Sequence, residues 1–292
     1  MKNERVVILG NFDGVHIGHQ VLILEGRRIA NELGCALTAW TFDSIRSLPL
    51  CSKNDRRDLL LEYGTDEVIF ASFDDVRDMT PERFVKEILF SELNAKVAVC
   101  GYNYSFGAGG KGTPELLAEL CSMHGISVTV VDKVSKNGVG ISSSLIRELI
   151  SKGNVEEAAS LLGRPFYVKA EVTHGAGLGR TVGIPTVNFD VTDFTCLPKF
   201  GVYATLTHID GKRYTSVTNV GVRPTVSDNR GTTVETHILD FDGDLYGKTV
   251  KVEFLSFIRD ESVFSSIEAL SEQISLDASV AKKTVNKFLE KE

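Results

Sequence analysis

The chain has 292 residues and a formal net charge of −7 at pH 7. Its length exceeds that of a typical single domain and suffices for two hydrophobic cores of about 130 to 160 residues each. A net negative charge gives no long-range attraction for nucleic acid or for an anionic membrane surface. The composition therefore argues against RNA, DNA or membrane partners, and it predicts that any bound phosphate is held in a local pocket.

The five cysteines are dispersed, odd in number and without a C-x-x-C pair. That pattern predicts free thiols in a reducing compartment rather than a disulfide framework. The first residues contain no long apolar region for export, and no stretch approaches the roughly 20 apolar residues that cross a bilayer. We therefore expect a cytoplasmic protein without a membrane-spanning segment.

Short apolar segments alternate with helical patterns along the first half of the chain. Such alternation is typical of a parallel α/β sheet, in which ligands gather at the carboxyl ends of the strands. The segment Thr80-Pro81-Glu82 is a helix entry, with a capping residue followed by a proline at the first helical position. Strands are expected at Val6 to Leu9, Leu37 to Phe42, Glu67 to Phe70, Val97 to Cys100 and Val128 to Val131. Helices are expected at Gly18 to Leu33, Asp55 to Tyr63 and Pro114 to His124, and as two short helices within Ser143 to Leu162, broken at Gly153-Asn154.

The sequence pattern changes near Gly163. From there on, segments rich in β-branched and aromatic residues are separated by turns that contain Gly, Asp and Asn. The strands expected there are Val168 to His174, Val202 to His208, Ser216 to Val220, Thr233 to Leu239 and Thr249 to Phe257. About six antiparallel strands in so short a segment predict a small closed barrel, which leaves no strand edge unpaired. The last apolar pattern, Ser266 to Leu289, predicts a helix that packs outside the barrel. We therefore expect two domains, residues 1–162 and 163–292.

The segment GNFDGVHIGHQ, residues 10 to 20, places two histidines where the first predicted strand ends and the first predicted helix begins. Backbone N–H groups at a helix start are unpaired and lie at the positive end of the helix dipole, so this junction favours phosphate. His16 and His19 add side-chain donors, and Gly10 and Gly14 permit a sharp turn. A zinc pair and a chance surface match are the alternatives, but no third Cys or His stands at ligand spacing.

The whole string resembles the signature of the HxGH nucleotidyltransferases, specifically the adenylyltransferase half of the bacterial bifunctional riboflavin kinase/FMN adenylyltransferase family, also called FAD synthetases. The resemblance implies a Rossmann-like domain with a parallel sheet and a site for ATP. The ATP contacts that it implies are Gly10, Asn11, Phe12, Asp13, Gly14, His16 and His19, with the two histidines as catalytic groups.

A second phosphate signal is ISSSLIR, residues 141 to 147. Serines at a helix start either cap the helix or turn toward a ligand, and Arg147 lies one turn beyond Ser143 on the same face. An ordinary capped helix with a surface arginine is the alternative. The segment resembles the ISSTxxR motif of the same nucleotidyltransferases, which implies ATP contacts at Ser143, Ser144 and Arg147. Many members have arginine where this chain has Leu145, so Leu145 is left out of the site.

The segment GYNYSFGAGGKGT, residues 101 to 113, combines glycines with aromatic side chains. It predicts a mobile loop whose flat faces pack against an aromatic ring. It resembles the flavin-side loop of the adenylyltransferase half, which implies FMN contacts at Asn103, Tyr104, Phe106 and Gly107. Asn103 departs from the acidic residue that is frequent at its position. The two aromatic residues serve equally well as core residues.

The segment HGAGLGRTVGIPTVNF, residues 174 to 189, begins with a glycine loop that suits phosphate and ends in an extended stretch. A dinucleotide fingerprint is ruled out, because Gly183 and Pro185 stand where its helix should begin. Thr186 and Asn188, two apart on a strand, share a face and offer neutral oxygen ligands that suit Mg²⁺ beside ATP. Hydrogen-bonded turn residues are the alternative.

Glu235 stands in the middle of a β pattern, where an unpaired carboxylate is unfavourable. A positioned carboxylate can accept the proton of an attacking alcohol and contributes about 10²- to 10⁴-fold to such a reaction. A plain exposed strand residue is the alternative.

The segments GRPF, GLGRTVGIPTVNF, FGVYA, NVGVRPT, VETHILDF, DLYG and FIRDE follow, in order, the pattern of the riboflavin kinase domain. By that resemblance Glu235 is the catalytic base. The other implied contacts are Gly177, Gly179 and Arg180 in the ATP flap, Thr186 and Asn188 for ATP and Mg²⁺, and Arg259 in the flavin-side loop.

Together the two resemblances cover nearly the entire chain and imply a bifunctional enzyme with small-molecule substrates. The barrel transfers the γ-phosphoryl group of ATP to riboflavin, and the first domain adenylylates the resulting FMN with a second ATP, both with Mg²⁺. The alternatives are a riboflavin kinase with a weakened adenylyltransferase half, suggested by Leu145 and Asn103, a flavin-binding regulator without turnover, and transfer to a different acceptor.

Overall fold

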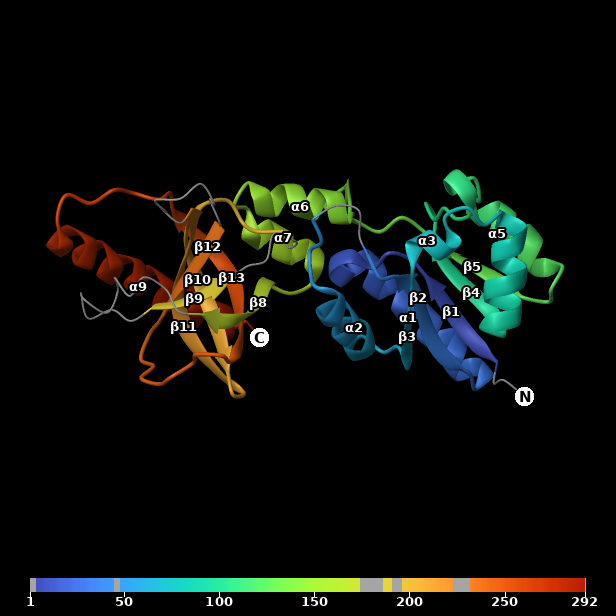
Figure 1. The fold of residues 1–292 in the computed structure, drawn as a ribbon, viewed down its shortest axis with the longest axis horizontal. Helices are drawn as coiled ribbons and strands as arrows, with labels where there is room; N and C mark the ends of the chain where they lie inside the picture. Colours follow the sequence, from blue (N-terminus) through green and yellow to red (C-terminus); the bar gives the residue numbers. More distant parts are fainter. Residues whose placement is uncertain (1–3, 45–47, 174–185, 191–195, 223–231, 292) are drawn as a thin grey trace. The chain divides into compact units, whose positions relative to one another are not determined.

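The computed structural model describes residues 4–44, 48–173, 186–190, 196–222 and 232–291. By its internal contacts the chain divides into two compact units, Met1–Ser143 and Ser144–Glu292. Each unit is described by itself below (Figure 1).

The first unit is built on a parallel sheet of five strands in the order β3-β2-β1-β4-β5 (Figure 1). The strands are β1 (Arg5–Leu9), β2 (Ala36–Phe42), β3 (Glu67–Ala71), β4 (Ala95–Gly101) and β5 (Ser127–Val131). The strands predicted for this half are confirmed, because continuous apolar runs of this length suit a sheet that is covered on both faces. The strand order reverses between β1 and β4, and open α/β sheets bind ligands at that switch point.

The central strand β1 is buried on both faces. Val6 and Ile8 pack against α1 (Ile17–Leu33), while Val7 packs in a second core on the opposite face. A Cβ on Gly26 would lie 2.7 Å from Ile8, so glycine at this position lets α1 approach the sheet closely. The close approach fixes where the first turn of α1 lies relative to the end of β1.

Short helices cover the rest of this sheet, and α2 (Lys53–Glu62), α4 (Pro81–Arg83) and α5 (Pro114–Ser122) begin at a capping side chain. Ser52, Thr80 and Thr113 accept hydrogen bonds from N–H groups in the first turn of the helix that follows each of them. The other helical segments are α3 (Phe73–Val76) and the π-helical η2 (Phe84–Glu92), with short 3-10 turns η1 (Asp13–Val15) and η3 (Ala108–Gly110) and a hairpin β6 (Ser135–Lys136) to β7 (Val139–Gly140). The predicted helices of this half are confirmed.

The ISSSLIR segment contains the start of α6 (Ser143–Ser151), and α7 (Val155–Leu162) comes after the predicted break. Internal contacts group them with the barrel, since α7 packs on its strands. The sequence placed both helices before a border at 162/163. That border between the functional domains stays a prediction.

The second unit contains the predicted barrel, a closed sheet in the order β10-β11-β12-β9-β8-β13. The strands are β8 (Phe166–Thr173), β9 (Thr186–Asp190), β10 (Gly201–Ile209), β11 (Lys212–Val222), β12 (Thr232–Ile238) and β13 (Thr249–Arg259). All pairings are antiparallel. The fold class, a Rossmann-like parallel sheet followed by a six-stranded barrel and a terminal helix, is therefore confirmed.

A ladder of buried hydroxyl groups connects three neighbouring barrel strands. The side chains of Thr205 and Ser216 lie 2.8 Å apart, those of Thr205 and Thr218 2.8 Å, and those of Thr218 and Thr236 2.9 Å. Successive side chains of a strand point to opposite faces, so Glu235 lies on the face opposite this ladder.

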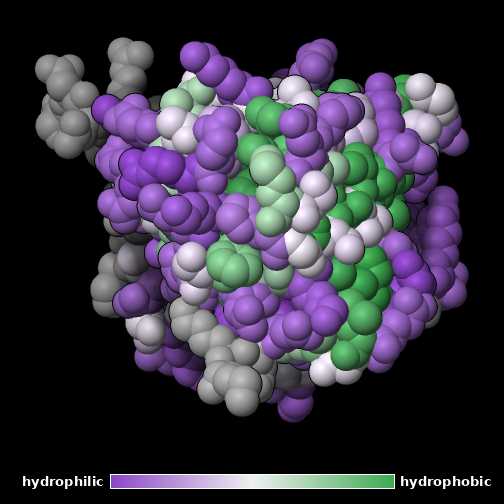
Figure 2. Space-filling model, turned by 90° about the vertical axis from the view of Figure 1, so that its right-hand side faces the viewer, coloured by the Kyte–Doolittle hydropathy of each residue, from purple (hydrophilic) through white to green (hydrophobic). Residues whose placement is uncertain are grey.

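The terminal helix α9 (Ile267–Leu289) packs outside the barrel, as predicted. Ala281 and Val285 contact apolar residues of β10, and the Ser266 side chain caps the first turn. Among the described residues, no helix combines the length and the apolar character that crossing a bilayer requires. Figure 2 shows one face of the first unit, on which hydrophilic side chains surround smaller apolar groups.

Candidate active sites

The turn between β1 and α1 has an unusual backbone. Phe12, Gly14 and Val15 adopt φ values of 51°, 74° and 41°, in the left-handed region. A β-branched residue such as Val15 rarely adopts that conformation, and its cost, on the order of 1–3 kcal/mol, persists only where the surroundings hold the backbone. Such strain is found most often at functional sites, and here it lies at the switch point of the sheet.

The two histidines of this turn stack on each other, with ring centroids 3.6 Å apart and an interplanar angle of 13°. His16 is the N-cap of α1, and its Nδ1 accepts a hydrogen bond of 3.3 Å from the backbone N–H of His19. A neutral His16 therefore carries its proton on Nε2. Burial, and secondarily the neighbouring His16, lowers the pKa of His19 well below its ordinary value of 6.5.

The other residues of the GNFDGVHIGHQ segment divide into exposed and buried ones. Asn11 is exposed. Phe12 is fully buried and meets the His19 ring edge-on at 5.3 Å, so its side chain is a core residue and only its backbone is left for a nucleotide. Asp13 is also buried, and its Oδ1 accepts from the Leu50 N–H at 2.8 Å. The ATP contact at Phe12 therefore stays a prediction, and it is confined to the main chain because the ring on this tight turn packs inward.

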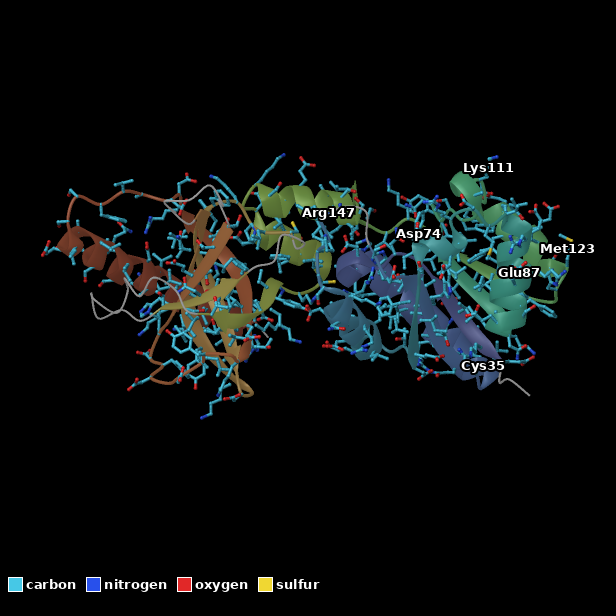
Figure 3. The ribbon with its side chains drawn as sticks, in the orientation of Figure 1. Cys35, Asp74, Glu87, Lys111, Met123 and Arg147 are labelled. Atoms are coloured by element: carbon cyan, nitrogen blue, oxygen red, sulfur yellow. The ribbon has the colours of Figure 1, made fainter. Side chains whose placement is uncertain are left out.

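Ser143 meets this same turn. Its Oγ donates to the Asp13 carbonyl oxygen at 2.9 Å. Ser144 and Arg147 lie in the second unit, where an Arg147 Nη1 lies 3.4 Å from the Ser144 Oγ, at the start of α6 (Figure 3). The structure thus joins Ser143 to the histidine turn, and ATP contacts at Ser143, Ser144 and Arg147 all stay predictions.

The predicted flavin-side loop is closed rather than open. The backbones of Phe106 and Gly112 pair through hydrogen bonds of 3.2 Å and 2.8 Å. Gly107 has a φ of 71°, and a Cβ there would lie 2.9 Å from the ring of Pro81. Backbone hydrogen bonds and tight packing thus hold the ends of this loop, and its mobility stays a prediction.

Two aromatic side chains of this loop, Tyr104 and Phe106, pack in the core of the first unit. Phe106 is buried and packs on Phe84, and Tyr104 stacks on Phe106 with ring centroids 5.9 Å apart. Burial raises the pKa of the Tyr104 phenol. Asn103 is exposed. Of the two alternatives left open by the sequence, the core role holds for Phe106.

The barrel brings Asn188 and Glu235 together. They are partners in the register of β9 and β12, so their side chains stand next to each other on one face of the barrel wall. Glu235 is half-buried. Asn188 is buried, and its Oδ1 has no hydrogen-bond partner among the described residues. An amide oxygen without a partner beside a carboxylate fits the neutral oxygen ligand that Mg²⁺ accepts. Thr186, half-buried two residues earlier, shares that face.

The predicted ATP flap of the barrel, with Gly177, Gly179 and Arg180, lies outside the described residues.

Comparison with known protein families agrees with both halves of the chain. Residues 1–145 match the family model for FAD synthetase, and residues 162–285 match the model for riboflavin kinase. The chain is 34% identical over 288 residues to a bifunctional riboflavin kinase/FMN adenylyltransferase of Bacillus subtilis, covering 94% of this chain and 90% of that protein. It is 32% identical over 289 residues to the protein of the same name from Escherichia coli K12, covering 95% and 92%.

The chain belongs to the bifunctional riboflavin kinase/FMN adenylyltransferase family. The predicted bifunctional enzyme, with both transferase activities on one chain, is confirmed by these relatives. A solved structure described as a macrolide-efflux protein from Streptococcus pneumoniae superposes with a TM-score of 0.86, at 32% identity and 97% coverage of both chains. The whole chain therefore shares its architecture with that structure.

Arg259, a predicted flavin contact in a loop, is instead the last residue of β13. Its guanidinium forms a two-pronged ion pair with the buried Asp277 of α9, at 3.1 Å from Nε and 2.8 Å from Nη2 to the same carboxylate oxygen. The strand therefore extends further than predicted, because this ion pair anchors its end to the terminal helix. A flavin contact by the remaining nitrogen, which donates to the Asp260 carbonyl at 3.1 Å, stays a prediction.

Two residues of these sites were missed by the sequence. Asn219 on β11 is the register partner of Glu235 on the side opposite Asn188, and its amide donates to Glu261 at 3.3 Å. Arg56 of α2 is almost fully buried and donates to the backbone at Asn11. The sequence does not distinguish Asn219 from other asparagines in turn-rich β segments, because only the strand register places it beside Glu235. It does not distinguish Arg56 from its neighbour Arg57, because only burial in the folded chain separates the two.

Proposed function

We propose that this family member performs its two reactions with separate sets of residues, one in each unit. The first unit uses the β1–α1 turn with its stacked histidines, and the second uses the polar row on the outer face of the barrel. The observation that supports this proposal is that each unit brings its own predicted polar side chains together, His16 with His19 and Asn188 with Glu235.

In the barrel, riboflavin is the nucleophile and ATP the phosphoryl donor. The ribityl 5′-oxygen forms a bond to the γ-phosphorus while the bond from that phosphorus to the β,γ-bridging oxygen breaks, giving FMN and ADP. Glu235 accepts the hydroxyl proton as the new bond forms. A base in this position contributes about 10²- to 10⁴-fold, and the remainder comes from alignment and charge stabilisation.

Asn188 and Thr186 are the proposed ligands for Mg²⁺ in the barrel. The unpartnered Asn188 Oδ1 supports this assignment, since a buried amide oxygen otherwise lacks the hydrogen bond that it needs. When bound, the ion neutralises the triphosphate and the departing group. Two neutral protein ligands leave the remaining positions to phosphate oxygens and water, which is the arrangement that Mg²⁺ favours.

A groove of about 580 Å³ in the second unit is the proposed place for the flavin ring in the kinase reaction. Pro198 and the exposed Phe200 give it an apolar wall, and Asp260 and Glu261 lie on it as well. Glu261 also accepts from Asn219, the neighbour of Glu235 on β11. Arg259, which immediately precedes Asp260, thus orients the edge of this groove through its ion pair with α9.

In the first unit, FMN is the nucleophile and its phosphate attacks the α-phosphorus of a second ATP. The new phosphoanhydride bond forms as the bond to pyrophosphate breaks, and no covalent enzyme intermediate is needed. His16 presents Nε2–H to the charge that develops on the triphosphate, because its Nδ1 is engaged with the His19 N–H. The lowered pKa of His19 keeps its ring neutral at pH 7, so the two stacked rings do not repel each other while His16 donates to the triphosphate.

Further contacts in the adenylyltransferase reaction are proposed from the sequence. Ser144 and Arg147 are the predicted ATP contacts beyond Ser143, and Asn103, Tyr104 and Gly107 are the predicted FMN contacts. Because Tyr104 packs against the core, its contact with FMN is confined to the face that Phe106 does not cover. All five cysteines are free thiols, which suits the reducing cytoplasm that we propose as the site of both reactions.

A time course with purified protein tests this proposal. Riboflavin, excess ATP and Mg²⁺ are mixed with the enzyme, and FMN, FAD and pyrophosphate are separated and quantified. We expect FMN to appear without a lag and FAD to follow, with one pyrophosphate released per FAD. Accumulation of FMN without FAD would instead favour a riboflavin kinase with a weakened adenylyltransferase half, the alternative that Leu145 and Asn103 suggested.

A further inference from the structure

Arg56 is a charged side chain buried beneath the β1–α1 turn. Only 1% of its surface is exposed, and it is the largest of the fully buried side chains that the structure describes. Its neighbour Arg57 is exposed, with a side chain 53% accessible. Burying a guanidinium is costly unless its donors are satisfied. A buried arginine at this position of α2 therefore requires hydrogen-bond acceptors around its guanidinium.

The donors of Arg56 go to backbone carbonyls at the ends of two adjacent strands. Nη1 donates to the Asn11 carbonyl at 3.0 Å, and Nη2 donates to the Phe42 carbonyl at 2.6 Å. Asn11 follows β1 by two residues, and Phe42 is the last residue of β2. A guanidinium presents its donors in a fixed planar fork, so the pair of bonds fixes the distance between the two strand ends.

Thr41 completes the same attachment. Its Oγ1 donates to the Asn11 carbonyl at 3.1 Å, so this one oxygen accepts from both Thr41 and Arg56. Thr41 is fully buried, and Arg56 further packs over the ring of Phe70 at 5.1 Å. Two buried donors on one carbonyl hold the backbone immediately before Phe12, where the left-handed conformations begin.

The guanidinium of Arg56 donates to the backbone carbonyl oxygens of Asn11, Phe42 and Asp43. The bonds from Nη1 and Nη2 end on these carbonyl oxygens, and Nε has no hydrogen-bond partner among the described residues. Burial lowers the pKa of the guanidinium below its ordinary value, with Cys51, Asp13 and Asp43 acting in the opposite direction. An arginine remains protonated in such surroundings, so a positive charge lies directly behind the turn.

We propose that Arg56 is a positioning residue of the adenylyltransferase reaction, which holds the β1–α1 turn in its strained conformation through the Asn11 carbonyl. This inference rests on the proposed function of the turn as the site of the triphosphate. The held backbone sets the direction of the N–H groups and of His16 toward the nucleotide. A displacement of about 1 Å in such a site is enough to lower a rate by about 10²-fold.

The test compares Arg56→Met, Arg56→Lys and Arg57→Met in full-length protein, using FMN with ATP and riboflavin with ATP as two separate assays. We expect Arg56→Met to lower kcat/KM for ATP in FMN adenylylation by about 10²-fold, with a rise in the KM for ATP. Arg56→Lys retains the charge but not the fork, so we expect an intermediate loss. Arg57→Met is the matched control on the same helix, and we expect it to leave both activities unchanged.

The split between KM and kcat separates positioning from damage to the fold. A loss of folded protein reduces the active fraction, which lowers the apparent kcat and leaves the KM for ATP as it was. That pattern would overturn the proposal, as would an unchanged adenylylation rate in folded Arg56→Met or an equal loss in Arg57→Met. The riboflavin kinase rate of each preparation measures the fraction of protein whose second unit is folded, and it serves as the internal control.

Thr41→Val keeps the proposal testable if Arg56→Met does not fold. It removes only the second donor to the Asn11 carbonyl and preserves the shape of the side chain. We expect a smaller rise in the KM for ATP, about threefold, in line with the loss of one modest hydrogen bond. An unchanged KM in folded Thr41→Val would count against the proposal.

His16→Ala distinguishes failure of this inference from failure of the proposed function. If His16→Ala lost adenylylation while Arg56→Met and Thr41→Val kept it, only the role of Arg56 would be wrong. If His16→Ala kept adenylylation, the turn itself would not be the site, and the inference would fall with it.

Discussion

The hydroxyl of Ser143 donates a 2.9 Å hydrogen bond to the main-chain carbonyl of Asp13, 130 residues earlier in the chain. The bond joins the two segments from which the sequence predicted ATP contacts independently. Asp13 follows the left-handed Phe12 and is itself buried. Ser143, the first helical residue of the ISSSLIR segment, therefore contacts the histidine turn, and its hydroxyl has a structural partner as well as a predicted ligand.

Removing this bond should loosen the turn. We expect Ser143→Ala to lower the free energy of unfolding of the first unit by about 1 kcal/mol, the net worth of one hydrogen bond, and to raise the KM for ATP in FMN adenylylation. Ser122→Ala is the matched control, because its hydroxyl bonds locally to the Glu119 carbonyl on the surface of α5. Urea titration and steady-state kinetics measure the two effects. An equal effect in both variants would show that the contact with Asp13 has no special role.

The two activities should be separable by single substitutions. We expect Glu235→Gln to lower riboflavin phosphorylation by about 10²-fold or more while sparing FAD synthesis from supplied FMN, because an amide cannot accept the hydroxyl proton. His16→Ala should do the reverse, since it removes the Nε2 donor and the cap of α1 together. Separate assays with riboflavin and with FMN measure this crossed pattern. If both folded variants lost both activities, the assignment of roles would be wrong.

The Mg²⁺ requirement of the kinase reaction should depend on Asn188. Chelation with EDTA should abolish both reactions, because the triphosphate then carries its full charge. We expect Asn188→Leu to raise the Mg²⁺ concentration for half-maximal riboflavin phosphorylation by about 10-fold or more, as is found when metal-site groups are removed. The Mg²⁺ dependence of FMN adenylylation in the same variant is the control and should not move. An unchanged requirement in the kinase assay would remove Asn188 from the metal site.

The stability of the first unit should fall as the pH falls below about 6.5, the ordinary pKa of histidine. The pKa of His19 is lowered in the folded state. At a pH between this lowered pKa and 6.5, the unfolded chain therefore binds more protons than the folded chain. The free energy of unfolding then rises with pH in this window, with a slope of up to about 1.4 kcal/mol per pH unit, and levels off above it.

Urea unfolding of the first unit at a series of pH values between 5 and 8 measures this slope. The His19→Gln variant should flatten it, because glutamine does not titrate. His124→Gln, which changes a ring that contacts the exposed Phe90 instead, should keep the slope. If His19→Gln showed the full slope of the parent, the titration of His19 would not be its cause.

The sequence alone determined the elements and the family. A continuous apolar run such as that of β1 is typical of a strand buried between two helical layers, so the parallel sheet follows from a local pattern. Short β-branched segments separated by turns are typical of antiparallel strands that close into a barrel, so the barrel follows in the same way. The capped starts of α2, α4 and α5 follow from side chains within one turn. The histidine pair and the ISSSLIR segment were likewise recognisable, because each is a contiguous string whose chemistry is set by spacing along one element.

Only the tertiary structure decided which side chains of the predicted binding segments are buried in the core. Phe12 and Phe106 lie in motifs that resemble binding segments, yet both are buried, because a tight turn leaves a large ring no other apolar surroundings. Arg56 and Arg57 are adjacent and alike in sequence, but the rotation of one helix places the first beneath the Asn11 carbonyl and the second in solvent. Contacts such as Ser143 with Asp13, or Asn188 with Glu235, depend on strand register and long-range packing, and no local pattern encodes them.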